Sequence, residues 1–327
     1  MAKRIEFDAP GGTDVLVYRD FTPADPAPGE VQVENKAIGV NYIDTYFRSG
    51  LYPAPVSPSG VGSEAAGVVV KTGANVKYIK VGDRVVYGQS PLGAYSEIHN
   101  VPEEKLAILP NGISFETAAA CFMKGLTAFY LLRKTYEVKA GEVFLFHAAA
   151  GGVGQIACQW AKALGAKMIG TVGSDEKAQK AKAAGAWETI NYNKEDIVER
   201  VLALTDGEKV GVVYDSVGKD TWLPSLDCLK RRGLMVSYGN ASGPVTGVDL
   251  GILNKKGSLY VTRPSVFGYI TNREELNEAS KAIFDLILSG KLTISIPADQ
   301  VYPLKDAALA HKRLEGRATT GSSILIP

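Results

Sequence analysis

Residues 147–154 read HAAAGGVG, and the segments on either side of this stretch decide the fold. The preceding segment, EVFLFHAA (142–149), is short, apolar and rich in β-branched and aromatic residues, which is typical of a buried strand. After it, apolar residues recur at helical spacing at Val153, Ile156, Ala157, Trp160 and Leu164. The chain is therefore predicted to pass from a strand through glycines into a helix.

The glycines of this turn are suited to a dinucleotide. Gly151 and Gly152 let the backbone turn without a Cβ in the way, and Gly154 lets the helix lie close to the sheet. The helix N-terminus offers N–H groups and a positive dipole end to an anion. An α/β domain with an incidental glycine turn is the alternative interpretation. We expect a pyrophosphate site shaped by Ala148, Gly151, Gly152, Val153 and Gly154.

Strand and helix signals alternate after the turn, which predicts a doubly wound parallel sheet in an α/β fold. A helix is expected at 221–230. The other segments of the pattern are KMIGTVG (167–173), SDEKAQKAKAAGA (174–186), TINY (189–192), GVVYDSVG (211–218) and GLMVSYG (233–239).

The end of the second strand indicates which dinucleotide binds. An acid at this tip would bind the ribose 2′-OH of NAD, but here the tip is Gly173 followed by Ser174. Asp175 and Glu176 come next, and they suit the first turn of a helix that Ser174 caps. Without a carboxylate at the tip there is no repulsion against a 2′-phosphate.

Donors for such a phosphate stand nearby. Ser174, Lys177 and Tyr192 could each donate a hydrogen bond to it, which favours NADP over NAD. Taken singly, Lys177 could also be a solvated surface lysine and Tyr192 an edge aromatic.

Composition excludes several classes of protein. The 327 residues are too many for one typical core, so two domains are expected. The net charge is +1 with no strong basic run, which argues against nucleic acid or membrane binding. No apolar segment reaches spanning length, and the start of the chain lacks the apolar core of a signal peptide. We expect a cytoplasmic enzyme.

The cysteines and histidines give no sign of a metal site. Three scattered cysteines provide neither a disulfide framework nor a zinc cluster, and they are expected to be buried: Cys121, Cys158 and Cys228. His99, His147 and His311 are also dispersed, so no metal is predicted. His147, on a buried strand, is interpreted as a hydrogen-bonded core histidine rather than a base.

The first third of the chain has a different sequence pattern. Short strands at 31–40, 65–73 and 83–88 are broken by Gly and Pro turns, which indicates mostly antiparallel structure. An amphipathic helix is expected at 274–290, and SSILIP (322–327) closes the chain as a strand. This last segment is expected to rejoin the first domain, and the cleft between the domains is the default binding site.

Several ordered motifs together resemble the quinone oxidoreductase (zeta-crystallin-like) branch of the medium-chain dehydrogenase/reductase superfamily. The resemblance implies a GroES-like catalytic domain at 1–124 and 262–327, a Rossmann domain at 125–261, and NADPH in the cleft. The motifs are PGEVQVENKAIGVNYIDTYFRSGLYP, GSEAAGVV, VGDRVVY, AAAGGVG and GRATTGSSILIP.

The sequence departs from the zinc-dependent members of this superfamily. Those carry a Cys within the segment that reads GVNYID here, and a Gly-His-Glu where this chain has Gly62-Ser63-Glu64. Asn41 and Ser63 stand in the ligand positions, and an amide and a hydroxyl cannot replace a thiolate and an imidazole. Zinc-assisted alcohol oxidation is therefore not expected, whereas a quinone needs less help to accept hydride or electrons.

The resemblance also implies residue roles. Ser174, Lys177 and Tyr192 would hold the 2′-phosphate beside Gly173. The nicotinamide, its ribose or the phosphates would be lined by Asn41, Thr127, Tyr238, Gly239, Asn240 and Arg317.

Four candidate residues in the first and last parts of the chain also have alternative, purely structural interpretations. Arg317 could reach an anion bidentately or be a surface charge, and Asn41 could be an Asx-turn residue. Tyr46 and Tyr52 could orient a quinone by hydrogen bonding or stacking, or simply pack as wall residues.

The sequence-based hypothesis is an NADPH:quinone reductase in which the protein supplies positioning. An NADPH-dependent enone or enal reductase is the alternative enzyme. A crystallin-like or RNA-binding protein is the non-enzymatic alternative, against which the near-neutral charge argues. By resemblance we expect a homodimer formed through the sheet edge at Gly257 to Val266.

Overall fold

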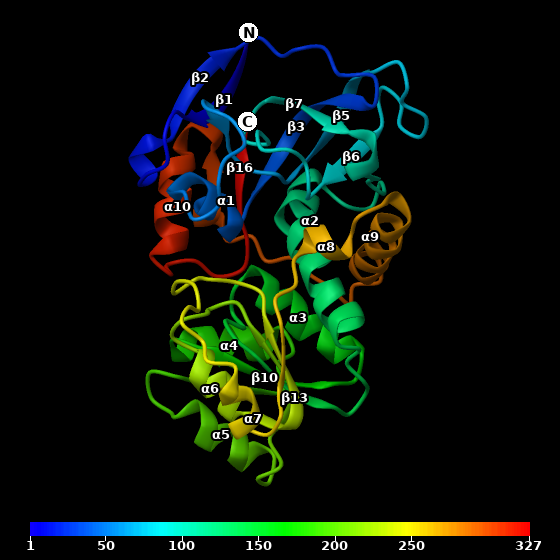
Figure 1. Cartoon of the computed structure of the whole chain (residues 1–327). Helices are drawn as coiled ribbons and strands as arrows, with labels where there is room; N and C mark the ends of the chain where they lie inside the picture. The colour runs from blue at the N-terminus through cyan, green and yellow to red at the C-terminus, as the bar shows by residue number, and fades with distance from the viewer. The chain divides into compact units, whose positions relative to one another are not determined.

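The computed structural model describes all 327 residues, which form two compact units (Figure 1). The first unit comprises Met1–Leu126 and Ile270–Pro327, and the second comprises Thr127–Tyr269. Helix α2 (Phe115–Tyr130) carries the chain from the first unit into the second. No helix has the length and apolar character needed to cross a membrane.

The second unit contains a six-stranded sheet in which every pair is parallel, in the order β11-β10-β9-β12-β13-β14. This confirms the predicted doubly wound sheet. The strands are β9 (Val143–Phe146), β10 (Lys167–Val172), β11 (Glu188–Asn191), β12 (Val210–Asp215), β13 (Leu229–Ser237) and β14 (Tyr260–Thr262).

Helices pack against this sheet in two groups. One group, α3 and α4, contacts β10, and in the other α6 packs on β12 and β13 beside α5. An apolar core lies between the sheet and the second group, where the fully buried Leu145, Ile169 and Val213 of the sheet meet Val201 of α5 and Leu226 of α6. The helices of this unit are α3 (Gly152–Ala163), α4 (Asp175–Ala183), α5 (Ile197–Leu204), α6 (Trp222–Asp227), α7 (Gly251–Lys255) and α8 (Val266–Tyr269), with a π-helical turn η3 (Leu131–Thr135) after α2.

Two predicted boundaries in this unit differ from the structure. The strand predicted at 142–149 ends at Phe146, and the next four residues form a turn instead. The helix predicted at 221–230 ends at Asp227, because Leu229 already pairs with Val210 as the first residue of β13. Tertiary pairing of the strand overrides the helical periodicity at this point.

The first unit is mainly antiparallel. Its larger sheet runs β15-β16-β3-β5-β6-β8, and β7 also pairs with β3. The final strand β16 pairs antiparallel with β3, so the chain end joins this sheet, as predicted. A smaller sheet has the order β2-β1-β4.

The elements of the first unit enclose a second apolar core that includes Ile38, Val85 and Leu106. Its strands are β1 (Ala2–Phe7), β2 (Val17–Phe21), β3 (Glu30–Val40), β4 (Ser59–Gly60), β5 (Ala65–Thr72), β6 (Arg84–Tyr87), β7 (Ile98–Pro102), β8 (Leu106–Ile108), β15 (Val301–Pro303) and β16 (Ser323–Ile326). Its helices are α1 (Tyr42–Ser49), α9 (Arg273–Leu288) and α10 (Ala307–Glu315), with 3-10 turns η1 (Thr13–Val15), η2 (Glu103–Lys105), η4 (Ala298–Gln300) and η5 (Leu304–Asp306).

The turn between β9 and α3 tolerates no side chain at Gly154. A Cβ there would lie 2.6 Å from Ala149 Cα and would also collide with the Ala148 carbonyl oxygen. Ala148 itself has a φ of 57°, a left-handed conformation that costs a non-glycine residue energy. Close packing of the helix on the turn therefore fixes both residues.

Gly154→Ala is expected to lower the free energy of unfolding by about 1–3 kcal/mol, because the added methyl group must push the helix off the turn. Urea denaturation followed by circular dichroism measures this change. Gly29→Ala is the matched control, since a Cβ at Gly29 meets nothing within 4 Å. Equal stability of the two variants would contradict the packing argument.

Candidate active site

The carboxyl ends of the central parallel strands carry the predicted cofactor residues of the second unit. The glycines follow the turn after β9 and begin α3, Gly173 follows β10, and Tyr238 follows β13. Since parallel strands end at one edge of their sheet, these segments gather there. This is where open α/β sheets bind their ligands.

The glycine turn brings the start of α3 to this edge. Gly151 is the N-cap of α3, so the first turn of the helix directs its amides and dipole outward from the sheet. Beneath the turn, His147 is fully buried, with Nδ1 2.9 Å from Thr171 Oγ1 and Nε2 2.9 Å from Ser225 Oγ. The prediction of a hydrogen-bonded core histidine is confirmed.

The acids after β10 are paired with cations. Asp175 accepts hydrogen bonds from Lys194 Nζ at 2.5 Å and Asn191 Nδ2 at 2.7 Å, and Glu176 lies 2.8 Å from Lys180 Nζ. The bonds from Lys194 and Asn191 lower the pKa of Asp175, and Lys180 lowers that of Glu176. Both carboxylates are therefore charged, and each is paired with a lysine of the second unit.

Ser174, Gly173 and Tyr192 lie together at the β10 tip. Ser174 Oγ accepts from the Lys177 backbone N–H at 3.2 Å, which confirms the predicted N-cap of α4. A Cβ at Gly173 would lie 2.5 Å from Tyr192 Oη, so the tyrosine hydroxyl rests against the glycine. The structure thus groups the predicted 2′-phosphate residues, including Lys177 in the first turn of α4.

The loops after β12 and β13 are tied to each other. Asp215 Oδ1 accepts from the backbone N–H of Val217 at 2.7 Å and of Gly218 at 2.9 Å. The Tyr238 N–H donates to the Asp215 carbonyl at 2.8 Å, and its ring lies 5.8 Å from that of Phe146. Gly239 and Asn240 follow in the same loop, and Thr127, on α2, also belongs to this unit.

The remaining predicted residues lie in the first unit: Asn41 is the N-cap of α1, Tyr46 lies within α1, Tyr52 follows it, and Arg317 follows α10. Asn41 is 6% exposed, and its Nδ2 donates to Glu64 Oε2 at 2.5 Å. The rings of Tyr46 and Tyr52 meet edge to face at 5.2 Å. Arg317 has a φ of 56° in the loop between α10 and β16. The predicted residues thus form two sets, one in each unit.

A buried chain of hydrogen bonds joins α1 to α10, and sequence reasoning missed it. Arg48 Nη1 donates to His311 Nδ1 at 3.3 Å, so the His311 proton sits on Nε2, which lies 3.1 Å from Tyr95 Oη. Tyr95 then donates to Asp44 Oδ2 at 2.9 Å. Arg48 also forms a bidentate pair with Glu315, at 2.8 Å for both bonds. No sequence motif links these residues, because they meet only through the tertiary fold.

The residues around Glu64 do not suit a zinc ion. Glu64 Oε1 accepts from the Met123 N–H at 2.6 Å, and Lys124 Nζ lies 3.6 Å from Oε2, so a cation already faces the carboxylate. Asn41 supplies an amide to this carboxylate and Ser63 precedes it in the chain, and neither side chain is the thiolate or imidazole that zinc prefers. No group of three His, Cys, Asp or Glu side chains in the chain could hold a metal ion.

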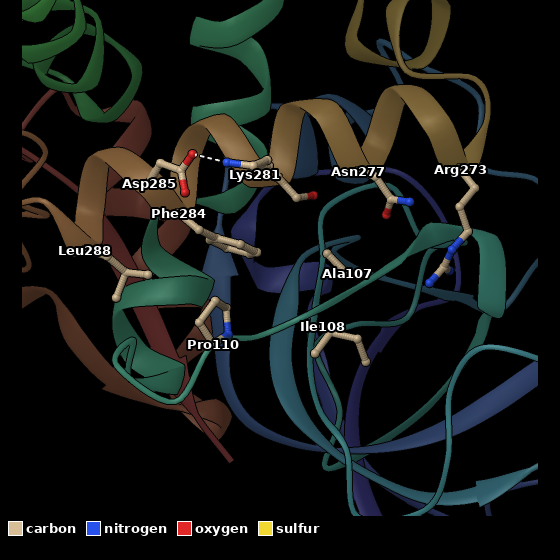
Figure 2. Close-up of a pocket in the computed structure, with 10 residues that line it drawn as sticks. Ala107, Ile108, Pro110, Arg273, Asn277, Lys281, Phe284, Asp285 and Leu288 are labelled. Carbon is tan, nitrogen blue, oxygen red and sulfur yellow. Dashed lines mark hydrogen bonds and ion pairs between the residues drawn. The ribbon is translucent and has the colours of Figure 1, made fainter.

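A separate hollow of about 290 Å³ lies between β8 and α9 in the first unit (Figure 2). Figure 2 shows Lys281 and Asp285 paired with each other on α9, beside the ring of Phe284. None of the residues that line this hollow belongs to the predicted site.

Comparison with known proteins places the chain in a family. Residues 27–111 match the alcohol dehydrogenase GroES-like domain, and residues 152–285 match the zinc-binding dehydrogenase domain. The chain is 70% identical to the quinone oxidoreductase of Salmonella typhimurium over 327 residues, the full length of both proteins. The chain belongs to the quinone oxidoreductase family. This family is the branch of the medium-chain dehydrogenase/reductase superfamily that the sequence motifs predicted.

Two further relatives are similar over nearly the whole chain. The crystal structure of Escherichia coli quinone oxidoreductase complexed with NADPH superposes with a TM-score of 0.99 at 68% identity, covering 100% of each chain. A 2-haloacrylate reductase from a Burkholderia species is 46% identical, over 97% of this chain and 96% of the relative.

The buried carboxyl of Asp44 makes the stability of the protein depend on pH. Burial raises the pKa of this carboxyl to about 7 from its ordinary value of 3.8, and its Oδ1 is buried without a hydrogen-bond partner. Between about pH 4 and 7 the folded protein keeps a proton here that the unfolded chain has lost. Asp44 therefore makes the free energy of unfolding fall as the pH rises through this window.

Asp44→Asn is expected to remove this dependence, because the amide cannot ionise. The unfolding free energy of the wild type minus that of the variant should fall between pH 4 and 7 by up to about 1.4 kcal/mol per pH unit, and level off above pH 8. Denaturant titrations across this range measure it, with the exposed Asp206→Asn as baseline. A difference that stays constant with pH would show that Asp44 is ionised throughout.

Proposed function

We propose that this chain is an NADPH-dependent quinone reductase that works without a metal ion. The observation that carries the proposal is the likeness, over the whole chain, to the E. coli quinone oxidoreductase solved with NADPH, at 68% identity. NADPH would supply the two electrons of the reduction. The protein would bind and orient both reactants and exclude competing reactions.

In this proposal the edge of the parallel sheet holds the cofactor. The amides at the start of α3 would bind the pyrophosphate, where the missing side chain of Gly154 lets helix and turn approach. Lys177, Ser174 and Tyr192 would bind the 2′-phosphate. The ion pairs of Asp175 and Glu176 support this choice, because they neutralise the nearest carboxylates.

Three residues of the first unit would meet the nicotinamide end and the quinone. Asn41 would contact the cofactor, and Tyr46 and Tyr52 would orient the substrate. Tyr46 is only 9% exposed and its ring touches that of Tyr52, which supports positioning and stacking rather than proton transfer. Arg317 would reach an anionic part of the cofactor.

The direct test is oxidation of NADPH and NADH with a naphthoquinone and, separately, with an α,β-unsaturated ketone, in buffer treated with a chelator. Fast NADPH-selective turnover with the quinone is the expected result. Silence with both acceptors would overturn the proposal.

An enone or enal reductase is the second candidate function. It is favoured by the 46% identity to a 2-haloacrylate reductase, whose name denotes a substrate with a carbon–carbon double bond. Turnover confined to the unsaturated ketone would select it.

A homodimer through the edge of the parallel sheet and a cytoplasmic location complete the proposal, with a catalytic domain at 1–124 and 262–327 and a cofactor domain at 125–261. The edge strand β14 supports the dimer, since Tyr260 is 60% and Val261 40% exposed on an unpaired strand edge. Light scattering should give twice the chain mass of 34.8 kDa, and a monomer mass at micromolar concentration would refute the dimer.

Lys177→Ala is expected to raise the KM for NADPH about tenfold while leaving that for NADH nearly unchanged. One charge-assisted bond to the 2′-phosphate is lost, worth roughly 1.5 kcal/mol. Initial-rate kinetics with both cofactors measure the ratio. Lys182→Ala, on the same helix, is the control, and equal effects of Lys177→Ala on the two cofactors would remove Lys177 from the phosphate site.

A further inference from the structure

Lys124 is a buried cation without a hydrogen bond. It is the one charged residue in the apolar run AAACFMKGLTAFYLL (118–132), and it is only 7% exposed. Its Nζ has no hydrogen-bond partner and lies 3.6 Å from Glu64 Oε2, at ion-pair distance. The three N–H donors of a buried ammonium normally form hydrogen bonds. An ammonium that forms none therefore calls for an explanation.

The carboxylate beside Lys124 is held rigidly from several sides. Glu64 is fully buried and accepts from the Met123 N–H and from Asn41 Nδ2. It also fills the space that a side chain at Gly39 in β3 would need. Glu64 is thus fixed, whereas the lysine has a flexible four-carbon stem and is held only by its 3.6 Å ion pair with Glu64, which lengthens when it turns.

Lys124 and Asn41 meet at the same carboxylate oxygen. Both nitrogens face Glu64 Oε2, at 3.6 Å and 2.5 Å. The ammonium therefore lies beside the residue that the proposed function assigns to the nicotinamide end of the cofactor. In this buried setting a positive charge acts more strongly on a nearby oxygen than it would in water.

We propose that Lys124 is a catalytic residue whose ammonium donates a hydrogen bond to the carbonyl oxygen of the substrate and stabilises the negative charge that reduction places there. This inference rests on the proposed function and deepens it. The hydride leaves the nicotinamide as its C–H bond breaks and forms a bond to one quinone oxygen, and an electron pair moves through the ring onto the other oxygen, which faces Lys124. A proton from water then completes the hydroquinone and leaves hydroxide, while NADPH becomes NADP⁺ and Lys124 keeps its proton.

The competing explanation is that Lys124 only neutralises Glu64. Three variants separate the two roles. Lys124→Met removes the cation and leaves Glu64 unpaired, Glu64→Gln does the reverse, and the double variant restores charge balance without the ammonium. Lys281→Met, which removes an exposed lysine of α9, is the control for loss of a lysine.

Kinetics with 1,4-naphthoquinone give the first readout. Lys124→Met is expected to lower kcat by about 10²- to 10³-fold, the usual effect of losing one donor to a developing oxyanion. The double variant should stay equally slow, with a dissociation constant for NADPH within about twofold of the wild type. Recovery of wild-type turnover by the double variant would overturn the proposal, because a counter-ion is all that it would have restored.

Binding of 4-nitrophenol gives a readout that does not depend on turnover, since its anion absorbs in the visible. The wild type should bind the anion about tenfold more tightly than either variant lacking Lys124. If the wild type reduces no acceptor, the proposed function fails, yet this titration still tests the ammonium. Equal binding of the anion by wild type and double variant would exclude Lys124 from the oxygen site even if Lys124→Met alone did not fold.

Discussion

The second unit depends on the contact between the first turn of α3 and the turn that follows β9. No Cβ fits at Gly154, and Ala148 is held in a left-handed conformation so that its carbonyl can lie under the helix. The turn is also anchored from below, because His147 joins Thr171 of β10 to Ser225 of α6. These constraints fix the start of α3 at the edge of the sheet, where its dipole is available to an anion.

The first unit is organised around buried charge. Glu64 collects hydrogen bonds from Asn41 and from the backbone of α2, and Asp44 ends the chain of bonds that runs from Arg48 through His311 and Tyr95. Burial lowers the pKa of His311 to about 3 and raises that of Glu64. Burying these ionisable groups costs free energy that well-packed apolar residues in their place would not cost. We interpret this loss of folding stability as the consequence of keeping polar groups in fixed positions for a substrate.

The sequence predicted most of the regular strands and helices well. Apolar runs bounded by glycines mark β10, β12 and the core of β13, and the amphipathic pattern marks α9, because burial on one face imposes a period on the residues. It failed where neighbouring chain segments decide the outcome. The end of α6 is set by pairing of Leu229 with Val210, and no local signal at Cys228 reveals this.

The candidate site shows the same division. The residues at the β10 tip could be grouped from sequence, since strand ends meet at one edge of a parallel sheet. Lys124 could not, although its charge within an apolar run was a visible signal, because its meaning depends on Glu64, 60 positions away. The Arg48–His311 contact joins helices from opposite ends of the chain and has no local signature.

The assignment of the sheet edge as an NADPH site can be tested by comparing the dissociation constants of NADPH and NADH, determined by calorimetry on the full-length protein in chelator-treated buffer. NADPH is expected to bind at least about tenfold more tightly, a difference of roughly 1.4 kcal/mol from contacts to the 2′-phosphate. Equal affinities, or tighter binding of NADH, would contradict the assignment of the sheet edge as an NADPH site.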